Sequence, residues 1–359
     1  MKMKPRSELV VWAEHTLRDV LEQVPFINIQ SIEREKHIGK FIVGIFVNIT
    51  IGSSKEQSLI VELNSNGQPR FARIAINQLL RYREACPEAY LIFMAPYISP
   101  QTADICKEDG IGHIDFAGNC FISFGELYIK QIGEQNTHAT RRDLISLFAV
   151  KSSRVLRVLL GSPWKVWRMQ EIADEARVSL GQVGNVYKLL LDREWIKKDH
   201  DGVSLIEPCK LLNDWANAYT FRKNELYNYF SPTSIPEIEA YIADICTAKG
   251  IEYALTGFSA AARLIPTINC TYPMVYVNSI EDVVSSLVLK DPKGGLKTGK
   301  LFTLLLPYDS GVLYGTRVIE DIKVVSPMQA YIDIKRYRGE WEKAADAIME
   351  NIIKPEWSK

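Results

Sequence analysis

Apolar residues recur every three to four positions in three successive segments in the middle of the chain, and this spacing predicts three helices. The first covers residues 152–160 and stops at the Gly-Ser-Pro run of residues 161–163. The second covers residues 169–176. The third starts at Ser179, which has capping-box spacing to Gln182, so that each can satisfy a free backbone donor of the other.

Two short strand-like runs follow these helices, at residues 195–196 and 203–206, around a tight turn at residues 199–202. The order is helix, helix, turn, helix and hairpin. It predicts a winged helix-turn-helix between residues 152 and 206.

The third helix has one apolar face and one polar face. In the major groove of a DNA duplex, Gln and Asn can read an adenine edge, Lys can reach guanine or a phosphate, and Gly allows close approach of the backbone. Basic residues after the helix and in the wing can contact phosphates. The candidate DNA-binding residues are Gln182, Gly184, Asn185, Lys188, Arg193, Lys197 and Lys198. Winged helices also dock proteins, so both interpretations stay open.

Charge adds a local signal only. The chain of 359 residues has 43 basic and 43 acidic residues, so its net charge predicts no partner. Between residues 141 and 170 the basic residues outnumber the single acid, Asp143. These basic residues are Arg141, Arg142, Lys151, Arg154, Arg157, Lys165 and Arg168. The cluster suits either a nucleic-acid footprint or an ordinary solvated face.

No stretch approaches 18 apolar residues and the N-terminus lacks a signal-type apolar block, so we expect a soluble, cytoplasmic protein without a membrane partner. The six cysteines are widely spaced, without a CxxC pair. They indicate reduced, mostly buried thiols rather than disulfides or a zinc site. We expect no metal and no cofactor.

The first 140 residues alternate between strand-like and helix-like patterns. Helices are predicted at residues 6–24, 69–83 and 100–109, and strands at residues 41–51, 57–63, 90–95, 114–116, 120–124 and 128–132. This order predicts a mixed α/β sheet covered by helices.

The stretches LIVELNSNG and INQLLRY within this order are similar to the PD-(D/E)xK, or restriction-endonuclease-like, nuclease fold. The chemistry of that fold needs an Asp on one strand and Glu-x-Lys on the next, to hold magnesium and activate water. Here Glu62 matches the glutamate and Gln78 matches a helix glutamine, but Asn64 replaces the lysine and the preceding strand has no acid. The resemblance therefore implies a nuclease-like domain without catalytic residues.

Two acids remain weak catalytic candidates, Glu62 and Asp115. Asp115 lies in GIGHIDFAGN, where it is either a site acid or a turn-forming residue beside an Asn at positive φ. We favour the turn.

The last third again alternates helices and strands. Helices are predicted at residues 211–219, 237–249, 281–289, 327–336 and 340–353, and strands at residues 253–255, 274–278, 301–306 and 312–314, with a boundary near residues 231–236. The TGFSAA stretch after a strand resembles the opening of nucleotidyltransferase folds. Transfer chemistry would need paired acids on the next strand, but MVYVNS has none and Asp309 comes much later. A degenerate domain is expected.

Three stretches together resemble the AbiEi-type antitoxins of type IV toxin–antitoxin systems: TGFSAA, LLLPYDSGVLYG and VVSPMQAYIDIKRYRGEWEKAADAI. The resemblance covers roughly residues 60–355. It implies a transcriptional regulator that represses its own operon through the winged helix and does not bind its toxin directly. That family commonly carries the winged helix at the N-terminus, whereas about 140 residues precede it here.

The sequence thus predicts an α/β multidomain protein with three domains: a nuclease-like mixed sheet (1–140), a winged helix-turn-helix (141–230) and a nucleotidyltransferase-like α/β domain (231–359). The predicted function is a non-enzymatic, DNA-binding transcriptional regulator, acting on double-stranded DNA and as a homodimer if it follows other winged-helix regulators. A metal-dependent nuclease using Glu62 and a protein-interaction scaffold are the alternatives. The recognised DNA sequence, a cognate toxin and any small-molecule effector are not encoded in a readable way.

Overall fold

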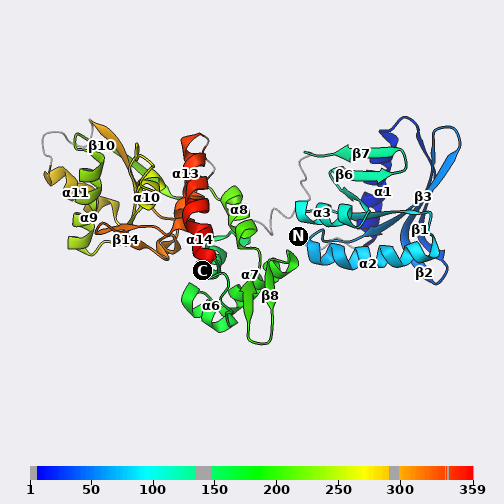
Figure 1. Cartoon of the computed structure of the whole chain (residues 1–359), viewed down its shortest axis with the longest axis horizontal. Coiled ribbons are helices and arrows are strands. Elements are labelled where there is room, and N and C mark those ends of the chain that lie inside the picture. The colour runs from blue at the N-terminus through cyan, green and yellow to red at the C-terminus, as the bar shows by residue number, and fades with distance from the viewer. Residues whose placement is uncertain (1–5, 134–146, 291–298, 336, 338, 359) are drawn as a thin grey trace. The chain divides into compact units, whose positions relative to one another are not determined.

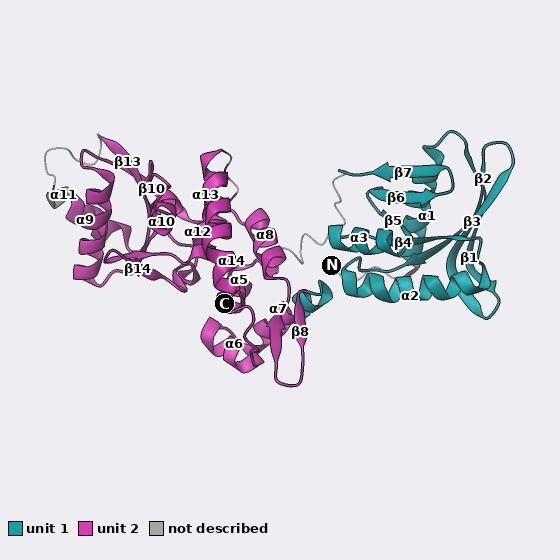
Figure 2. Cartoon of the chain, in the orientation of Figure 1, with its two compact units in different colours: residues 1–144, 188–194 teal, residues 145–187, 195–359 magenta. Residues whose placement is uncertain are grey.

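The structure, a computed structural model, describes residues 6–133, 147–290, 299–335, 337 and 339–358 (Figure 1). Two units are separated by their internal contacts (Figure 2): residues 1–144 with 188–194, and residues 145–187 with 195–359. Within the described ranges, no helix is both long and apolar enough to cross a bilayer.

The first unit is built on a seven-stranded sheet whose strands lie side by side in chain order. They are β1 (Ile27–Ile38), β2 (Phe41–Ile51), β3 (Lys55–Leu63), β4 (Tyr90–Ala95), β5 (Gly112–Asp115), β6 (Cys120–Phe124) and β7 (Leu127–Gln131). β3, β4 and β5 run parallel and the outer pairs run antiparallel. Parallel neighbours require crossovers, and α2 (Pro69–Ala85) and α3 (Pro100–Glu108) supply them.

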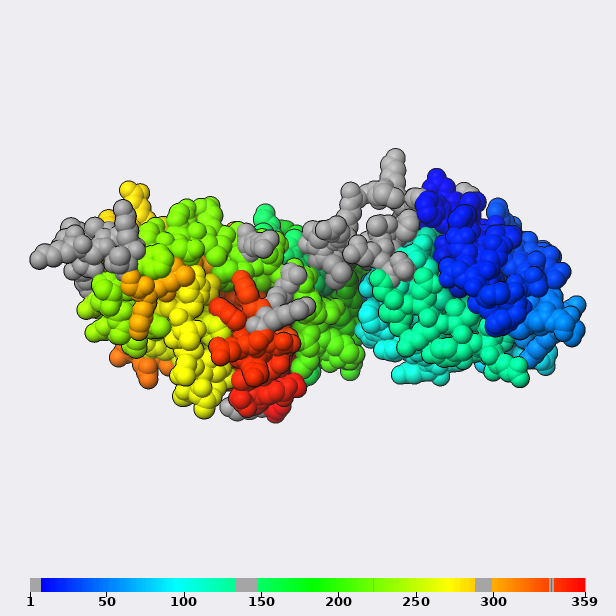
Figure 3. All heavy atoms as spheres, turned by 90° about the horizontal axis from the view of Figure 1, so that it is seen from above, coloured from blue at the N-terminus to red at the C-terminus, as the bar shows by residue number. Residues whose placement is uncertain are grey.

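Both faces of this sheet are apolar. Successive residues of a strand point to opposite faces, so consecutive apolar residues supply both cores. On β3, Leu59 and Val61 pack in the core under α1 (Arg6–Glu22), whereas Ile60 packs in the core under α2 and α3. Burial of both faces explains why the central strands are almost continuously apolar. Figure 3 shows α1 in blue on the surface of this unit.

The sequence patterns predicted β2, β4 and β6 with the bounds observed, but β1 was not predicted. β1 is the edge strand of the sheet, with residues such as Glu33 and Arg34 exposed. Arg34 pairs with Glu14 of α1, with Nη2 2.7 Å from Oε2. An edge strand has a solvated side, so charged residues interrupt the apolar alternation on which the prediction depends.

The middle of the chain forms α5 (Val150–Gly161), α6 (Met169–Ala176), α7 (Leu180–Asp192) and an antiparallel hairpin of β8 (Ile196–Lys198) and β9 (Val203–Leu205). Trp167 extends the hairpin through an antiparallel bridge to Val203. This is the order of elements that the sequence predicts for a winged helix-turn-helix. α7 is one continuous helix, although its last residues are grouped with the first unit.

The remainder of the second unit surrounds a six-stranded sheet with the strand order β10-β13-β12-β11-β15-β14. The strands are β10 (Glu225–Ser231), β11 (Tyr253–Thr256), β12 (Met274–Val277), β13 (Lys300–Leu306), β14 (Arg317–Ile319) and β15 (Ile322–Val324). The helices are α8 (Pro208–Ala218), α9 (Ile235–Lys249), α10 (Gly257–Leu264), α11 (Ile280–Lys290), α12 (Pro327–Ile334) and α13 (Glu340–Ile348). In Figure 1, α9 and α11 lie on one side of this sheet and α12 and α13 on the other.

Three expectations about this region differ from the structure. β10 pairs with β13, so the sheet begins before the boundary predicted near residue 231. Residues 312–314 are not a strand: η2 (Ser310–Leu313) is a 3-10 helix, because the Asp309 carboxylate accepts from the Gly311 amide at 2.8 Å and caps the turn. The helix predicted at 340–353 continues from α13 through a π-helical turn, η3 (Met349–Ile353), into α14 (Lys354–Trp357). The three-domain division itself stays a prediction.

Candidate nucleic-acid interface

α7 separates its buried and exposed positions sharply. Val183, Val186 and Leu190 are fully buried, while Gly181, Asn185 and Lys188 are exposed. A side chain built at Gly181 or at the half-exposed Gly184 would meet no atom within 4 Å. The only acidic residue of the helix, Asp192, is buried. Apart from Leu180 at the first position of the helix, which is 51% exposed, the exposed face of α7 is small, polar and free of acidic groups.

Two of the predicted DNA-binding residues have contacts inside the protein. Gln182 is half-buried, and its side-chain Nε2 donates to Ser152 Oγ at 2.9 Å. Its backbone N–H donates to Ser179 Oγ at 3.2 Å, so half of the predicted capping box forms. Arg193 is 4% exposed, and its Nη1 donates to the Leu189 carbonyl at 2.9 Å. Arg193 therefore binds a carbonyl in the last turn of α7 and is not exposed on the surface of the protein.

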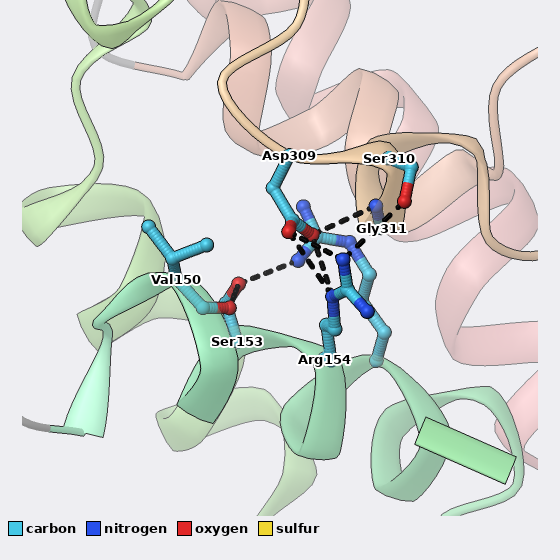
Figure 4. A network of polar contacts seen from close by, with 7 residues as sticks. Val150, Ser153, Arg154, Asp309, Ser310 and Gly311 are labelled. Carbon is cyan, nitrogen blue, oxygen red and sulfur yellow. Dashed lines mark hydrogen bonds and ion pairs between the residues drawn. The ribbon is translucent and has the colours of Figure 1, made fainter. Parts of the chain in front are cut away.

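The basic cluster expected between residues 141 and 170 is also reduced. Arg154 forms a bidentate ion pair with Asp309, with Nη2 2.7 Å and Nε 2.9 Å from its carboxylate oxygens (Figure 4). Asp309, considered above as a distant acid for transfer chemistry, is thus a structural partner of α5. Lys151, Lys165 and Arg168 are exposed. Arg141, Arg142 and Asp143 lie outside the described residues.

Arg157 is buried in a polar network beneath α5. Its Nη2 donates to Gln329 Oε1 at 2.6 Å, and Gln329 Nε2 donates to Asp333 Oδ1 at 2.8 Å. Asp333 also accepts from Thr256 Oγ1 at 2.6 Å and from the Tyr276 hydroxyl at 3.2 Å. Burial raises the pKa of Asp333 to about 6, and these donors limit the rise. The TGFSAA stretch therefore uses its threonine to hold a buried carboxylate.

A cavity of about 480 Å³ lies between the start of α5 and the turn from α6 to α7. Lys151, Arg177 and Ser179 line it together with Asp174, whose Oδ1 already accepts from Gln170 at 2.8 Å. Arg177 ends α6 in the left-handed conformation, with φ of 52°. Two cations and a hydroxyl at the start of a helix form a favourable position for a phosphate. Arg177 and Ser179 were not among the predicted DNA-binding residues, because no sequence motif distinguishes a phosphate-binding turn arginine or capping serine from an ordinary one.

The wing carries mixed charge. Lys197 and Lys198 are exposed on β8, and their contact with phosphate stays a prediction. At the tip, Asp199 Oδ1 accepts from the amides of Asp201 at 3.0 Å and Gly202 at 3.2 Å. The Asp199 carboxylate is thus directed into its own turn, while the second acid of the tip, Asp201, is exposed, as are the two lysines of β8.

The two acidic candidates in the first unit have structural contacts. Asp115 is 3% exposed and its carboxylate accepts from the Ala117 and Asn119 amides and from Asn119 Nδ2, at 2.9 to 3.0 Å. This is the turn-forming role that the sequence favours, although Gly118 and not Asn119 has the positive φ, 88°. Glu62 Oε2 lies 3.5 Å from the Tyr82 hydroxyl. In the described part of the chain, no group of three or more His, Cys, Asp or Glu side chains is arranged to hold a metal ion.

All six cysteines are free thiols, three of them buried and three half-buried. Burial raises the pKa of Cys106 and of Cys246 to about 12, so both are protonated at neutral pH. No disulfide supports the fold among these residues.

Comparison with known proteins places one similarity on the C-terminal region. Residues 204–354 match the family described as "Transcriptional regulator, AbiEi antitoxin, Type IV TA system". The match starts within β9 and ends in the last helices, so it covers less than half of the chain and leaves out α5 to α7. No curated protein matches the chain.

One solved structure is similar over part of the chain, a repair endonuclease from Pyrococcus abyssi. The identity is 17% and the TM-score 0.21, over 28% of this chain and 46% of that one. At this level the likeness carries no argument about fold or activity. What the comparisons establish is that the C-terminal region is similar to a family of transcriptional regulators, the AbiEi antitoxins.

Proposed function

We propose that the protein is a DNA-binding transcriptional regulator and that α5, α6, α7 and the β8–β9 hairpin act as a winged helix-turn-helix. The observation that carries the proposal is the exposed face of α7, which after its first residue, Leu180, is small, polar and without acidic groups. On this helix Asn185 and Lys188 present an amide and an ammonium to solvent, while Val183, Val186 and Leu190 are buried. A helix of this composition suits the major groove.

Phosphate contacts are assigned to the exposed cations around this helix. Lys151 and Arg177 line the cavity at its start, and Lys197 and Lys198 project from the wing. Such contacts set register and orientation on the duplex, and base contacts then add sequence preference. Gln182 and Arg193 are given no direct DNA contact in this proposal, because both are engaged within the protein.

The similarity of residues 204–354 to AbiEi antitoxins supports a more specific role, repression of the operon that encodes a type IV toxin–antitoxin pair. In this proposal the nuclease-like and nucleotidyltransferase-like domains are non-catalytic. Of the acids considered for such chemistry, Asp309 forms an ion pair, Asp115 accepts hydrogen bonds from its own turn, and Glu62 lies 3.5 Å from the Tyr82 hydroxyl. Binding as a homodimer to paired half-sites belongs to the same proposal.

The test is a fluorescence-anisotropy titration of the full chain against DNA from upstream of its gene, with a scrambled duplex for comparison. Asn185→Ala and Lys188→Ala are each expected to weaken binding by about tenfold, the loss of one good polar contact to DNA. Asn185→Ala is expected to relax sequence preference, and Lys188→Ala to weaken both duplexes. Lys343→Ala, an exposed lysine on α13, is the matched control and is expected to bind as the wild type does.

Binding that is indifferent to Asn185→Ala and Lys188→Ala, or equal for both duplexes, would remove the role assigned to α7. A protein partner that co-purifies after nuclease treatment and needs the same residues would instead support the scaffold interpretation.

A further inference from the structure

The six-stranded sheet of the second unit ends at a long edge strand, β10. All seven of its residues pair with β13 without a bulge, and no strand among the described residues pairs with its other side. Three large side chains of this strand are exposed: Leu226 is 45% exposed, Phe230 37% and Tyr227 36%. An exposed edge strand with apolar side chains is a template for pairing with another chain.

The other edges of the two large sheets carry features that discourage such pairing. β1 has four consecutive charged residues at positions 33–36, and β7 carries Lys130. β14 has only three residues and starts with Arg317. Charged side chains and short strands are the usual protection of sheet edges. β10 has neither, since its single charged residue, Glu225, stands at its first position.

The hydrogen bonds of β13 show which backbone groups of β10 point outward. The Thr303 N–H donates to the Pro273 carbonyl at 2.9 Å, so the backbone of Thr303 points toward β12 and away from β10. Thr303 lies opposite Asn228. Opposed residues of antiparallel strands either bond to one another or both point away. The N–H and C=O of Asn228 therefore point to the open edge, as do those of Leu226 and Phe230, two residues to either side.

The strand is complementary to a second copy of itself in one antiparallel register, with Asn228 opposite Asn228. Each outward backbone then meets an outward backbone, and the two can exchange both hydrogen bonds. No like charges are opposed, and apolar and aromatic residues meet on both faces. The opposed pairs are Leu226 with Phe230, Tyr227 with Tyr229, and Glu225 with Ser231. Centring the register on Tyr227 would instead oppose Leu226 with the polar Asn228.

We propose that two copies of this chain associate edge to edge through β10, so that their six-stranded sheets join into one. The two-fold axis passes between the two Asn228 residues, as in other self-complementary interfaces. One strand pair is smaller than the interface of about 1,600 Å² found in stable complexes, so we expect weak association of the free protein. The inference names the contact behind the homodimer and rests on the proposed function for its use on DNA. Its test contains no DNA, so either proposal can fail without the other.

The experiment is disulfide trapping of the full chain under mild oxidation, read by non-reducing electrophoresis. Asn228→Cys places two thiols opposite one another, with Cα atoms about 5.5 Å apart, which is within disulfide range. Leu226→Cys places them four residues apart along the strands, about 14 Å, which is too far. Covalent dimer is expected for Asn228→Cys and not for Leu226→Cys alone. An equimolar mixture of Leu226→Cys with Phe230→Cys is expected to restore it.

The wild type is the control for the six native cysteines, which are buried or half-buried, and it is expected to give no covalent dimer. In the Asn228→Cys background, Leu226→Lys puts a charge opposite an apolar residue of the second copy and is expected to abolish the cross-link. The matched control is Val318→Lys on β14, the opposite edge of the same sheet, where Val318 is 65% exposed. This substitution is expected to leave the cross-link unchanged.

A second measurement does not depend on replacing Asn228, whose Oδ1 accepts from Thr303 Oγ1 at 2.6 Å. Sedimentation velocity across a concentration series is expected to show a sedimentation coefficient that rises with concentration in the wild type and in Val318→Lys, and stays constant in Leu226→Lys. Cross-linking of Asn228→Cys no greater than that of Leu226→Cys would overturn the proposal. The same concentration dependence in the wild type and in Leu226→Lys would do so as well.

Discussion

At the scale of single residues, the buried histidine of the first unit links its environment to stability. The folded-state pKa of His113 is about 4, below the ordinary value of 6.5. Between these values the unfolded chain binds a proton that the folded chain does not, so the free energy of unfolding rises with pH from about 4 to 6.5. Each unit of pKa corresponds to about 1.4 kcal/mol, so the gain is about 3 kcal/mol.

We expect His113→Phe to remove this dependence, because phenylalanine does not titrate. The measurement is hydrogen exchange of the β5 and β6 amides at pH 5 and pH 7, corrected for intrinsic exchange rates, in the wild type and the variant. His37→Phe is the control and keeps the wild-type dependence. Equal protection of the wild type at both pH values would contradict the assigned pKa shift.

The buried aspartate of the second unit behaves in the opposite sense. Burial raises the pKa of Asp333 to about 6, from 3.8. The folded chain then binds a proton that the unfolded chain releases, so this stabilising contribution is complete below about 3.8 and is lost as pH rises through 6. Asp333→Asn is expected to remove this loss. The free energy of unfolding of the variant, relative to that of the wild type, is therefore expected to be higher at pH 7 than at pH 4. The measurement is chemical unfolding of both proteins at the two pH values, followed by tryptophan fluorescence, which comes mainly from the second unit. The same difference in free energy of unfolding between variant and wild type at both pH values would contradict the prediction.

The sequence identified the exposed residues of the candidate nucleic-acid interface only in part. Gln182, Asn185 and Lys188 are polar residues off the apolar face of α7 and Arg193 follows its last residue, and nothing in the sequence shows which of them are exposed. In the structure two are exposed, while Gln182 bonds to Ser152 and Arg193 is buried. The reason is physical: a long polar side chain can fold back onto a carbonyl or a neighbouring helix, and helical spacing does not report where its end goes.

At the scale of elements, the ion pair between α5 and the turn before η2 is the clearest tie. Asp309 is 9% exposed and Arg154 27% exposed, so removing one partner leaves the other poorly solvated. Arg154→Ala and Asp309→Ala are each expected to cost about 2 kcal/mol, as for hydrogen bonds to charged groups. The double variant is expected to cost less than the sum of the two.

A double-mutant cycle by urea unfolding measures this coupling. The matched control is the pair of Arg317 and Glu356, also bidentate but about 40% exposed on both sides. Its coupling is expected to stay below about 1 kcal/mol, because water screens it. Equal coupling for both pairs would show that burial adds nothing to the Arg154 contact.

Elements with both faces buried were predicted better than edge elements. β4 lies inside its sheet and its apolar run, residues 90–95, matched the strand exactly. The edge strands β1, β10 and β14 were not predicted, because their exposed residues interrupt the apolar pattern. Position in the sheet is not the whole explanation, since the edge strand β7 was predicted at residues 128–132 and the interior strand β15 was missed. The failure at residues 312–314 has another origin: Asp309 caps the turn, and a side-chain cap overrides the strand preference of Val312.

At the scale of the whole molecule, the balanced charge limits the DNA affinity that the proposed function can have. With 43 basic and 43 acidic residues there is no net attraction to a polyanion, so phosphate binding depends on the few exposed cations near α7. The exposed cations of the proposed interface are Lys151, Arg177, Lys188, Lys197 and Lys198. If all five contact phosphates, the slope of log affinity against log salt is about −4 to −5. Anisotropy titrations across a salt series measure it, and Lys188→Ala is expected to reduce its magnitude by about 1. A slope near zero would rule out phosphate contacts as the source of affinity.

The buried chain from Arg157 through Gln329 to Asp333 also determines how such proteins can be recombined. If residues 150–206 are moved into another protein, Arg154 loses Asp309 and Arg157 loses Gln329. Two guanidinium groups that are paired in this protein are then left without their partners. For the proposed regulator, DNA specificity is therefore expected to change when the outer positions of α7 are substituted in place, and to be lost when the three helices are moved into another protein without Asp309 and Gln329.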